Sequence, residues 1–394
     1  MGDMMRLFFV ADGRSPIALN WMAYFVGQGH EVHLASTFPC TPEIKLAGLY
    51  IVPVALSQAA GEVQQGYAGR GAGQILKKVL PVALRTAVRQ WIGPLTLPGT
   101  ARKLHHILAQ VQPDLVHAMR IPYEGMTAAL ADPAAPLLIS IWGNDFTLHA
   151  LSTRRMGRLT RQTLKRANAL QTDCQRDIRL AQQWGYPAQR PARVLPGGGG
   201  IQLELFYPPN ESVAEPLVIN PRGIRAYVRS DTFFRAIPRV LERIPSARFL
   251  CPVMAGEAQA ERWVQALGIS DHVELLPRQT RSQMAALFRQ AQVAVSVSEH
   301  DGTPNTLLEA MASGCFPVAG DIEPLHEWIT HGENGLLVDP GDSNALAEAI
   351  LTGLEQATLR GRAQEINRCL VAERANYQHV MREAESYYEE IISR

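Results

Sequence analysis

The chain has few cysteines, and they form no pattern. Five cysteines are spread over 394 residues, their number is odd, and no two have the spacing of a CxxC motif. A disulfide framework or a cysteine-based zinc site is therefore not expected. The reducing cytoplasm is the compartment that this usage fits best.

Long apolar runs are also missing. No window approaches the roughly 18 uninterrupted apolar residues of a transmembrane helix. The first residues, MGDMMRLFFVADGRSP, reach a charge and turn residues too early for a secretory signal peptide. We expect a cytoplasmic protein and leave open a location at the inner face of the membrane.

A net charge of either sign is lacking too. The chain has 38 Lys and Arg against 37 Asp and Glu, a formal net charge of +1 at pH 7. This balance gives no reason to expect nucleic-acid binding, so an anionic ligand would need a local basic cluster. Hydrophobic residues make up 46% of the chain, which is long enough for two globular cores.

Short apolar runs alternate with helical patterns along the chain. The run from Arg6 to Ala11 ends at a DGRS turn, and a helical pattern with Pro16 in its first turn follows. Gly27 and Gly29 close this helix. The order predicts a parallel, doubly wound α/β sheet. Further strands are expected at 32–35, 115–118, 137–142, 169–172, 217–219, 248–253, 273–276, 293–297, 317–319 and 336–338.

Four consecutive glycines, Gly197 to Gly200, interrupt the alternation near the middle. Such a run costs backbone entropy and packs nothing, so it cannot lie inside a helix or a good strand. It is either a surface loop or a hinge whose backbone approaches a ligand closely. We favour the hinge, because a second set of strands follows.

The segment after the strand 293–297 contains the most informative residues. Thr303 and Pro304 are typical of an N-cap followed by proline at the first helical position, and Gly314 ends the helix. A helix N-terminus at the carboxyl end of a parallel strand is an anion site, here with the N–H groups of residues 305–307. Glu309 would repel a phosphate, so hydroxyl groups are its better partners. A diphosphate flanked by polyols is a nucleotide sugar.

Seven residues separate Asp301 from Glu309, and AMASG follows. This pattern resembles the E-x7-E signature of the retaining glycosyltransferases of family 4, which have the GT-B fold. The resemblance continues through FPVA and NGLLVDPGD and includes the segment from Gly200 to Phe206. It is close in the C-terminal half of the chain and an outline in the N-terminal half.

The resemblance implies two Rossmann-like, doubly wound domains that face a central cleft. Residues 1–200 would form the acceptor-side domain and residues 201–376 the nucleotide-sugar domain, with a C-terminal helix, 377–394, returning to the first domain. The implied activity is hexosyl transfer, with retention, from a UDP- or GDP-sugar to a saccharide or lipid-linked acceptor.

The family's site residues can be placed on this sequence. Glu309 resembles the acid that binds the ribose, and Asp301 stands one methylene shorter for the acid that contacts the donor sugar. Arg222 matches the first member of a basic pair that grips the diphosphate, and Arg229 is nearest to the second. Further donor-binding candidates are Gly13, Arg14, Arg225, Pro277, Arg278, Gly302, Thr303, Pro304, Asn305, Thr306 and Leu307.

Acceptor-binding candidates follow two N-terminal strands, and they are His117, Arg120, Trp142, Asn144 and Asp145. His117 remains from an H-x-H pattern of the family and suits a satisfied, half-buried role at least as well. Trp142 would stack on a sugar or belong to the core, and Asp145 would accept hydrogen bonds from the acceptor.

The family uses no protein nucleophile, and the leaving diphosphate helps to deprotonate the acceptor. On that basis we expect no metal and no cofactor beyond the nucleotide sugar as co-substrate. The acids at Asp321, Glu323, Asp339 and Asp342 are interpreted as loop and helix-start residues.

Residues 75–104 form a basic, acid-free stretch containing Lys77, Lys78, Arg85, Arg89, Arg102 and Lys103. It suits either a membrane surface or the solvated face of packed helices, and we favour the second while leaving peripheral membrane contact open. The alternative functions are a nucleotide-sugar epimerase and a non-catalytic nucleotide-sugar-binding protein. A dehydrogenase is disfavoured because the DGRS turn lacks G-x-G-x-x-G. The oligomeric state is not predicted.

Overall fold

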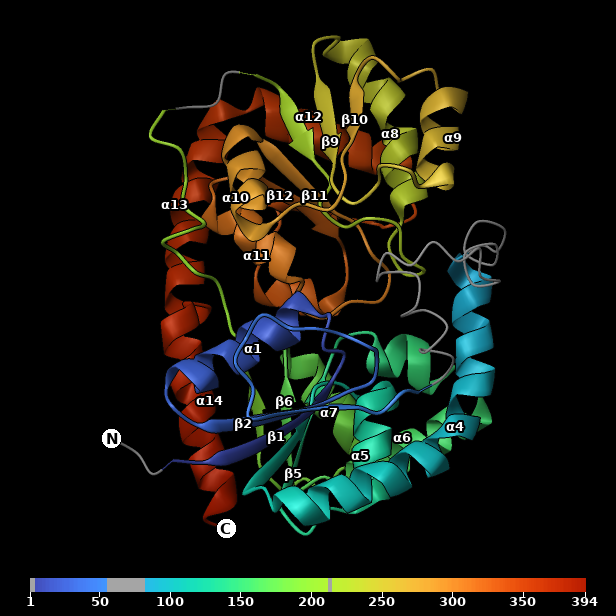
Figure 1. The fold of residues 1–394 in the computed structure, drawn as a ribbon. Helices are drawn as coiled ribbons and strands as arrows, with labels where there is room; N and C mark the ends of the chain where they lie inside the picture. The colour runs from blue at the N-terminus through green and yellow to red at the C-terminus, as the bar shows by residue number, and fades with distance from the viewer. Residues whose placement is uncertain (1–3, 55–81, 212–214) are drawn as a thin grey trace. The chain divides into compact units, whose positions relative to one another are not determined.

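The computed structural model describes residues 4–54, 82–211 and 215–394 (Figure 1). The chain folds into two compact units, one of Met1–Gly199 with His379–Arg394 and one of Gly200–Gln378. Each unit has its own parallel sheet and hydrophobic core. In the described part of the chain, no helix has the length and apolar character needed to cross a membrane.

The first unit contains a seven-stranded sheet in the order β3-β2-β1-β4-β5-β6-β7, with parallel pairing throughout. Its inner strands are continuous apolar runs, because a parallel sheet is covered on both faces. The strands are β1 (Arg6–Ala11), β2 (Glu31–Ser36), β3 (Gly48–Ile51), β4 (Leu115–Ala118), β5 (Leu137–Ile141), β6 (Ala169–Thr172) and β7 (Ala192–Val194).

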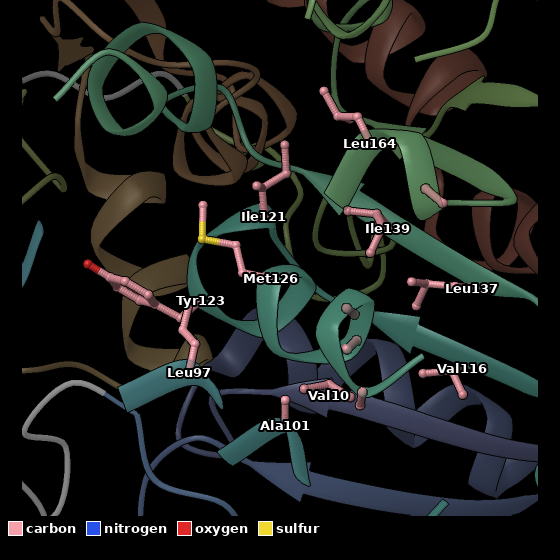
Figure 2. Packing of buried hydrophobic residues seen from close by; sticks show 14 of the residues in the cluster. Val10, Leu97, Ala101, Val116, Ile121, Tyr123, Met126, Leu137, Ile139 and Leu164 are labelled. Carbon is pink, nitrogen blue, oxygen red and sulfur yellow. The ribbon is translucent and has the colours of Figure 1, made fainter. Parts of the chain in front are cut away.

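Helices cover both faces of this sheet. Helix α1 begins at Pro16, as predicted, with Ser15 as N-cap accepting a hydrogen bond from the Ala18 N–H at 3.4 Å. Figure 2 shows apolar side chains of β1, β4 and β5 packing with Leu97 and Ala101 in one core. The helices are α1 (Pro16–Gly27), α4 (Val82–Val111), η1 (Ile121–Gly125), α5 (Met126–Ala131), η2 (Asp145–Ala150), α6 (Arg154–Arg166) and α7 (Gln175–Gln183).

The C-terminal helix α14 (Tyr377–Ile392) packs into the first unit, as the resemblance implied. Tyr388 lies on the ring of Phe25 with 4.7 Å between ring centroids, and its hydroxyl accepts a hydrogen bond from Trp21 Nε1 at 2.8 Å. Tyr387 donates to the carbonyl of Leu170 in β6 at 2.9 Å. Buried aromatic residues therefore tie the end of the chain to its beginning.

The second unit contains a six-stranded parallel sheet in the order β10-β9-β8-β11-β12-β13. Its strands are β8 (Leu217–Ile219), β9 (Arg248–Cys251), β10 (Val273–Leu275), β11 (Val293–Ser296), β12 (Phe316–Gly320) and β13 (Leu336–Val338). One core packs α8 (Ser230–Arg243), α9 (Ala258–Ala266) and α12 (Ser343–Glu355) on the sheet. A second core holds α10 (Arg281–Gln290), α11 (Asn305–Ala312), η3 (Glu323–Glu327) and α13 (Ala357–Arg374).

The sequence analysis missed two short strands, β3 and β7. Both lie at an edge of the first sheet, and their residues are exposed or partly buried. An edge strand covered on fewer sides needs no continuous apolar run, so the pattern that found the inner strands was absent.

The last glycine of the run, Gly200, makes a close contact inside the second unit. Gly200 has a φ of +90°, and a Cβ there would lie 2.4 Å from the carbonyl oxygen of Ala375. The Ile201 N–H donates to that same oxygen at 2.6 Å. The close neighbour of Gly200 is thus the backbone of Ala375 in the second unit, and the hinge and the approach to a ligand stay predictions.

Candidate active site

The site candidates of the second unit gather where its strand order reverses. Strands β8 and β11 are neighbours in the sheet but not in the sequence. Because they are parallel, the loops that follow them leave from the same side of the sheet, the carboxyl ends of the strands, which is called the site edge below. The two loops are joined directly, since the Arg229 N–H donates to the Val297 carbonyl at 3.1 Å and the Glu299 N–H to that of Tyr227 at 2.9 Å. Such a reversal is where an open α/β sheet binds its ligand.

Arg222 and Asp301 form an ion pair at the site edge. Nη2 of Arg222 donates to Asp301 Oδ2, and its Nη1 lies 3.4 Å from Thr306 Oγ1. The hydroxyl of Ser298 also donates to Asp301 Oδ2, at 3.1 Å. The arginine side chain is 8% exposed, and its buried Nε–H has no partner among the described residues. A nearly buried guanidinium with a remaining donor is suited to an anion.

The helix N-terminus lies beside this pair, one residue later than predicted. Helix α11 begins at Asn305 with Pro304 as its N-cap, so the prediction that Thr303 caps the helix is wrong. The Thr303 hydroxyl is instead buried and accepts a hydrogen bond from Trp328 Nε1 at 3.0 Å. The Leu307 N–H is occupied by the Pro304 carbonyl at 2.9 Å, and an anion would therefore meet the N–H groups of Asn305 and Thr306.

Glu309 lies in the second turn of α11, and its side chain is 14% exposed. Burial raises the pKa of its carboxyl group to about 7, against the lowering effect of Arg281. Arg281, at the start of α10, was missed by the sequence analysis. The capping box of Thr280 and Gln283 was a readable signal for a helix starting there, but not for the contact with Glu309.

Arg229 has carboxylate partners that the sequence analysis did not foresee. Its Nε and Nη2 donate to Asp231 at 2.9 and 3.0 Å, and its Nη1 donates to Glu299 at 2.6 Å. These two acids raise the pKa of Arg229 above its ordinary value. Contact with a diphosphate would require Arg229 to exchange at least one of these partners.

The remaining donor-side candidates lie nearer the surface. Arg225 is exposed, and its Nη1 donates to the Tyr227 hydroxyl at 3.2 Å. Pro277 and Arg278 are exposed after β10, and the Pro277 carbonyl accepts from the Val253 N–H at 3.3 Å.

In the first unit the strand order reverses between β1 and β4, and the DGRS turn follows β1. The Gly13 N–H donates to Ser36 Oγ at 3.0 Å, and a Cβ at Gly13 would lie 2.4 Å from Cys40 Sγ. A side chain at residue 13 would therefore have to displace the side chains of Cys40 and Ser36. The Arg14 guanidinium donates two hydrogen bonds to the Asp12 carboxylate, each 2.9 Å, and stacks on the ring of Phe38.

His117 is 1% exposed, and both of its ring nitrogens are occupied. Nδ1 lies 2.5 Å from the Tyr388 hydroxyl and Nε2 lies 2.7 Å from Ser140 Oγ. Burial lowers the pKa of the imidazole to about 3, so the ring is neutral. His117 links β4 to α14 and β5, and in this position it offers no surface to an acceptor.

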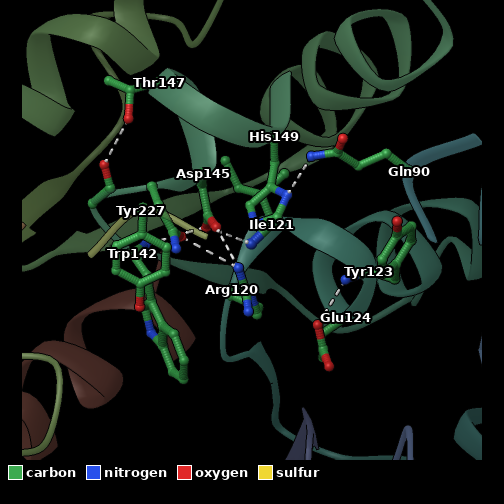
Figure 3. A network of polar contacts seen from close by, with 12 residues as sticks. Gln90, Arg120, Ile121, Tyr123, Glu124, Trp142, Asp145, Thr147, His149 and Tyr227 are labelled. Atoms are coloured by element: carbon green, nitrogen blue, oxygen red, sulfur yellow. Dashed lines mark hydrogen bonds and ion pairs between the residues drawn. The ribbon is translucent and has the colours of Figure 1, made fainter. Parts of the chain in front are cut away.

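Asp145 is similarly enclosed, with 1% of its surface exposed. Its carboxyl group accepts hydrogen bonds from the Ile121 N–H at 3.0 Å and from the Trp142 N–H at 3.2 Å, and pairs with Arg120 at 3.1 Å (Figure 3). Burial raises the pKa of Asp145, whereas Arg120 lowers it. The residue joins the loops that follow β4 and β5.

Arg120, Asn144 and Trp142 stay partly exposed around this carboxylate. The Arg120 guanidinium lies 5.2 Å from the ring centre of Trp142, and its Nη2 is 3.4 Å from Asn144 Oδ1. The indole Nε1–H of Trp142 is buried and has no partner within the described residues. Of the predicted acceptor-binding residues, these three are partly exposed, and acceptor contact by them stays a prediction.

Sequence reasoning missed two buried acids in the first unit, Glu124 and Asp177. Glu124 is 2% exposed and accepts hydrogen bonds from Thr37 Oγ1 at 2.8 Å and the Tyr123 N–H at 2.7 Å. Burial raises its pKa, while the positive charges of Arg120 and Arg89 oppose that rise. No motif marked Glu124, because its environment comes from residues distant in the sequence.

One group of potential metal ligands exists among the described residues, formed by Asp173, Cys174 and Asp177. Nη2 of Arg176 lies 2.8 Å from Asp177 Oδ1, so a guanidinium already supplies the positive charge there. Burial raises the pKa of the Cys174 thiol, which disfavours the thiolate form that a metal needs. The position is better described as an ion pair between Arg176 and Asp177 than as a metal site.

Two family models match this chain. Residues 13–198 match the "Glycosyl transferase 4-like domain", and residues 223–356 match "Glycosyl transferases group 1". A GDP-mannose:cellobiosyl-diphosphopolyprenol alpha-mannosyltransferase of Xanthomonas campestris is 25% identical over 289 residues, which cover 68% of this chain and 72% of that protein. The chain spans less than two thirds of the length of several other curated relatives.

Solved structures resemble the fold over nearly the whole chain. Sucrose-phosphate synthase from Thermosynechococcus elongatus has a TM-score of 0.74 at 17% identity, with 98% of this chain and 99% of that chain covered. Alr3699/HepE from Anabaena, in complex with UDP and glucose, has a TM-score of 0.72 at 15% identity, with the same coverage. These likenesses confirm the predicted GT-B fold.

Proposed function

We propose that this chain, which belongs to the GT4-like glycosyltransferases of the GT-B fold, transfers a hexose from a nucleoside-diphosphate sugar with retention of configuration. The observation that carries the proposal is the cluster of Arg222, Asp301 and the α11 N-terminus, with Glu309 one helical turn further on. A basic group, free helix N–H groups and a carboxylate in this order match a diphosphate followed by a ribose.

The diphosphate would occupy the space beside Arg222. The Nε–H of this arginine is buried, and no described residue accepts its hydrogen bond. Asp301 and Thr306 hold the two terminal nitrogens, so the guanidinium is positioned before a ligand arrives. Its charge and the dipole of α11 would stabilise the negative charge that develops on the leaving phosphate.

Glu309 would bind the ribose hydroxyls in its ionised form. Ionisation of this buried carboxyl group is unfavourable in the free protein. Two hydroxyl donors would compensate for the water that the carboxylate has lost, and Arg281, 3.8 Å away, favours the charged form. UDP and GDP are the proposed nucleotides.

Donor-sugar contact is proposed for Asp301 and for the backbone of residues 302–306. Asp301 already neutralises Arg222, and its shorter side chain keeps the carboxylate close to the loop. No protein nucleophile is proposed. The oxygen of the leaving diphosphate would accept the acceptor's proton, and no metal would be needed.

A saccharide or lipid-linked acceptor is proposed at the edge of the first unit that carries Arg120, Trp142 and Asn144. Trp142 would stack on an apolar sugar face, and Arg120 would donate hydrogen bonds. His117 and Asp145 are almost fully buried, so they would orient neighbouring residues and would not contact the acceptor themselves.

Label transfer tests the proposal directly. Purified protein is incubated with UDP- and GDP-hexoses labelled in the sugar, together with simple saccharides and lipid-linked saccharides, and products are separated by charge. We expect the label to leave the nucleotide, by transfer or slow hydrolysis, and the Glu309→Gln variant to be far slower. The Glu242→Gln change, at an exposed position of α8 in the same unit, is the matched control.

Other outcomes assign the alternatives. A label that stays on the nucleotide in an epimerised sugar would indicate an epimerase. Thermal stabilisation by nucleotide without any turnover would indicate a binding protein. Saturating ligand at about one hundred times its Kd stabilises a protein by roughly 2.7 kcal/mol, so the absence of stabilisation by UDP, GDP or ADP would contradict the proposed donor site.

A further inference from the structure

Helix α6 concentrates positive charge on one face. Its 13 residues, RRMGRLTRQTLKR, contain six basic side chains and no acid. Met156, Thr160, Thr163 and Leu164 are buried against the unit, which leaves the basic residues on the opposite side. The whole protein has a net charge of only +1, so this face departs strongly from the average.

Four exposed cations of α6 lack an acidic partner among the described residues. Arg154, Arg158, Arg161 and Lys165 have no ion pair with any acidic side chain in the described part of the chain. Arg166, at the end of the same helix, is paired with Asp132 at 2.6 Å. Four unpaired charges at helical spacing repel one another, a cost that an anionic partner would relieve.

A groove of about 550 Å³ runs along this face. The four cations line it together with Leu151 and Trp184. Arg161 lies 4.6 Å from the ring centre of Trp184, and Leu151 is 70% exposed. The groove thus combines phosphate-binding groups with apolar surface.

An exposed apolar turn of α4 adjoins this face. Trp91 is 70% exposed and Leu95, one turn later, is 60% exposed. Arg155 of α6 donates to the carbonyl of Pro94 at 3.2 Å, which places this turn of α4 beside α6. Figure 1 shows the two helices side by side in the first unit.

We propose that α6, Leu151 and the Trp91–Leu95 turn of α4 form a docking surface for a lipid bilayer that contains anionic phospholipids. Arginine and lysine beside exposed tryptophan and leucine are the combination that an interfacial membrane contact uses. A purely electrostatic partner would leave the exposed Trp91 and Leu151 unexplained. The surface does not depend on the donor chemistry proposed above.

This surface shares only the Trp91–Leu95 turn with the basic stretch 75–104 singled out in the sequence analysis. Residues 75–81, with Lys77 and Lys78, lie outside the described residues, as does the side chain of Arg85. Arg102 and Lys103 are exposed on α4. Among the described residues, four exposed cations without an ion pair cluster on α6, which the sequence analysis did not single out.

Vesicle flotation with the full chain tests the proposal. Phosphatidylcholine vesicles, with or without phosphatidylglycerol, are compared at low and high salt. The variant R154E/R158E reverses two exposed charges of the surface, and Trp91→Ser removes its apolar contact. The matched control R262E/R368E makes the same charge change at exposed positions of the second unit. Circular dichroism and thermal unfolding establish that each variant is folded.

We expect binding to the anionic vesicles only, weakened by salt. R154E/R158E should lower the partition coefficient at least about tenfold, and Trp91→Ser severalfold, while the control binds like the native protein. Three results would overturn the proposal: no binding by the native protein, equal losses in the control variant, or soluble heparin binding as tight as vesicle binding and insensitive to Trp91→Ser. The last would identify a polyanion surface instead.

Discussion

The guanidinium of Arg281 lies beside the carboxyl group of Glu309, with 3.8 Å between Nη2 and Oε1. Two effects oppose each other at this carboxyl group. Burial disfavours the charged form and Arg281 favours it, and burial is the larger, so the pKa is raised to about 7 from its ordinary 4.5. The carboxyl group proposed to bind the ribose therefore titrates near neutral pH.

This titration makes the stability of the free protein depend on pH. The folded state holds the Glu309 proton up to about pH 7, whereas the unfolded chain releases it near 4.5. The contribution of the neutral carboxyl group is present below pH 4.5 and is lost as the pH rises through 7. Glu309→Gln should remove this loss of unfolding free energy, which approaches about 3 kcal/mol at pH 8.

Urea unfolding of both proteins between pH 4 and 8 measures this difference. The variant should gain free energy of unfolding relative to the native protein as the pH rises. A difference that stays constant with pH would mean that Glu309 is ionised throughout. Glu242→Gln, at an exposed position of the same unit, is measured alongside as the control substitution.

The same substitution should weaken nucleotide binding while it stabilises the protein. Losing charge-assisted hydrogen bonds to the ribose should cost about 1.5–3 kcal/mol of binding free energy. Titration calorimetry with UDP and GDP at pH 8, where the native carboxyl group is ionised, measures the loss. Unchanged affinity in folded Glu309→Gln would exclude the ribose contact.

Arg222 and Arg229 should differ in their effect on phosphate binding. Alanine at either position should lower the affinity for the nucleoside diphosphate more than for the monophosphate, because only the diphosphate carries the outer phosphate. The loss should be larger for Arg222→Ala, since Asp231 and Glu299 already occupy Arg229. Calorimetry with both ligands tests this, and Arg262→Ala is the control.

Arg222→Ala also removes the partner of Asp301, so its stability has to be followed separately. Breaking a nearly buried pair from one side costs about 3–5 kcal/mol. The double variant R222A/D301A avoids the unpaired carboxylate. Equal losses of mono- and diphosphate affinity in that variant would mean that Arg222 does not contact the outer phosphate.

His117 should affect stability rather than acceptor binding. The pKa of its imidazole is about 3 in the folded protein, against an ordinary value of 6.5. Between these two pH values the unfolded chain therefore binds a proton that the folded protein does not bind. The stability contributed by neutral His117 is present above pH 6.5 and is lost progressively as the pH falls toward 3. The loss approaches about 5 kcal/mol at a pH well below 3.

His117→Gln keeps a hydrogen-bonding side chain without this titration. Acid unfolding of the variant should be less steep between pH 6.5 and 4, and its KM for acceptor should stay near the native value. A large rise in KM with unchanged stability would restore the acceptor role.

The sequence by itself determined those features of this protein that depend on residues adjacent along the chain. Continuous apolar runs predicted the inner strands, because parallel strands covered on both faces need no alternation. The Asp301-to-Glu309 spacing lies within one strand–loop–helix segment, so its placement at a sheet edge followed from local structure.

Only the tertiary structure decided which side chains meet. Arg281 reaches Glu309 from another helix, and His117 is enclosed by Tyr388, which lies 271 residues further along the chain. The sequence predicted Thr303 as an N-cap, but in the structure its hydroxyl accepts a hydrogen bond from Trp328 instead. Burial and pairing of polar groups come from segments distant in sequence, and the same side chain binds a ligand or supports the core according to which of those segments packs on it.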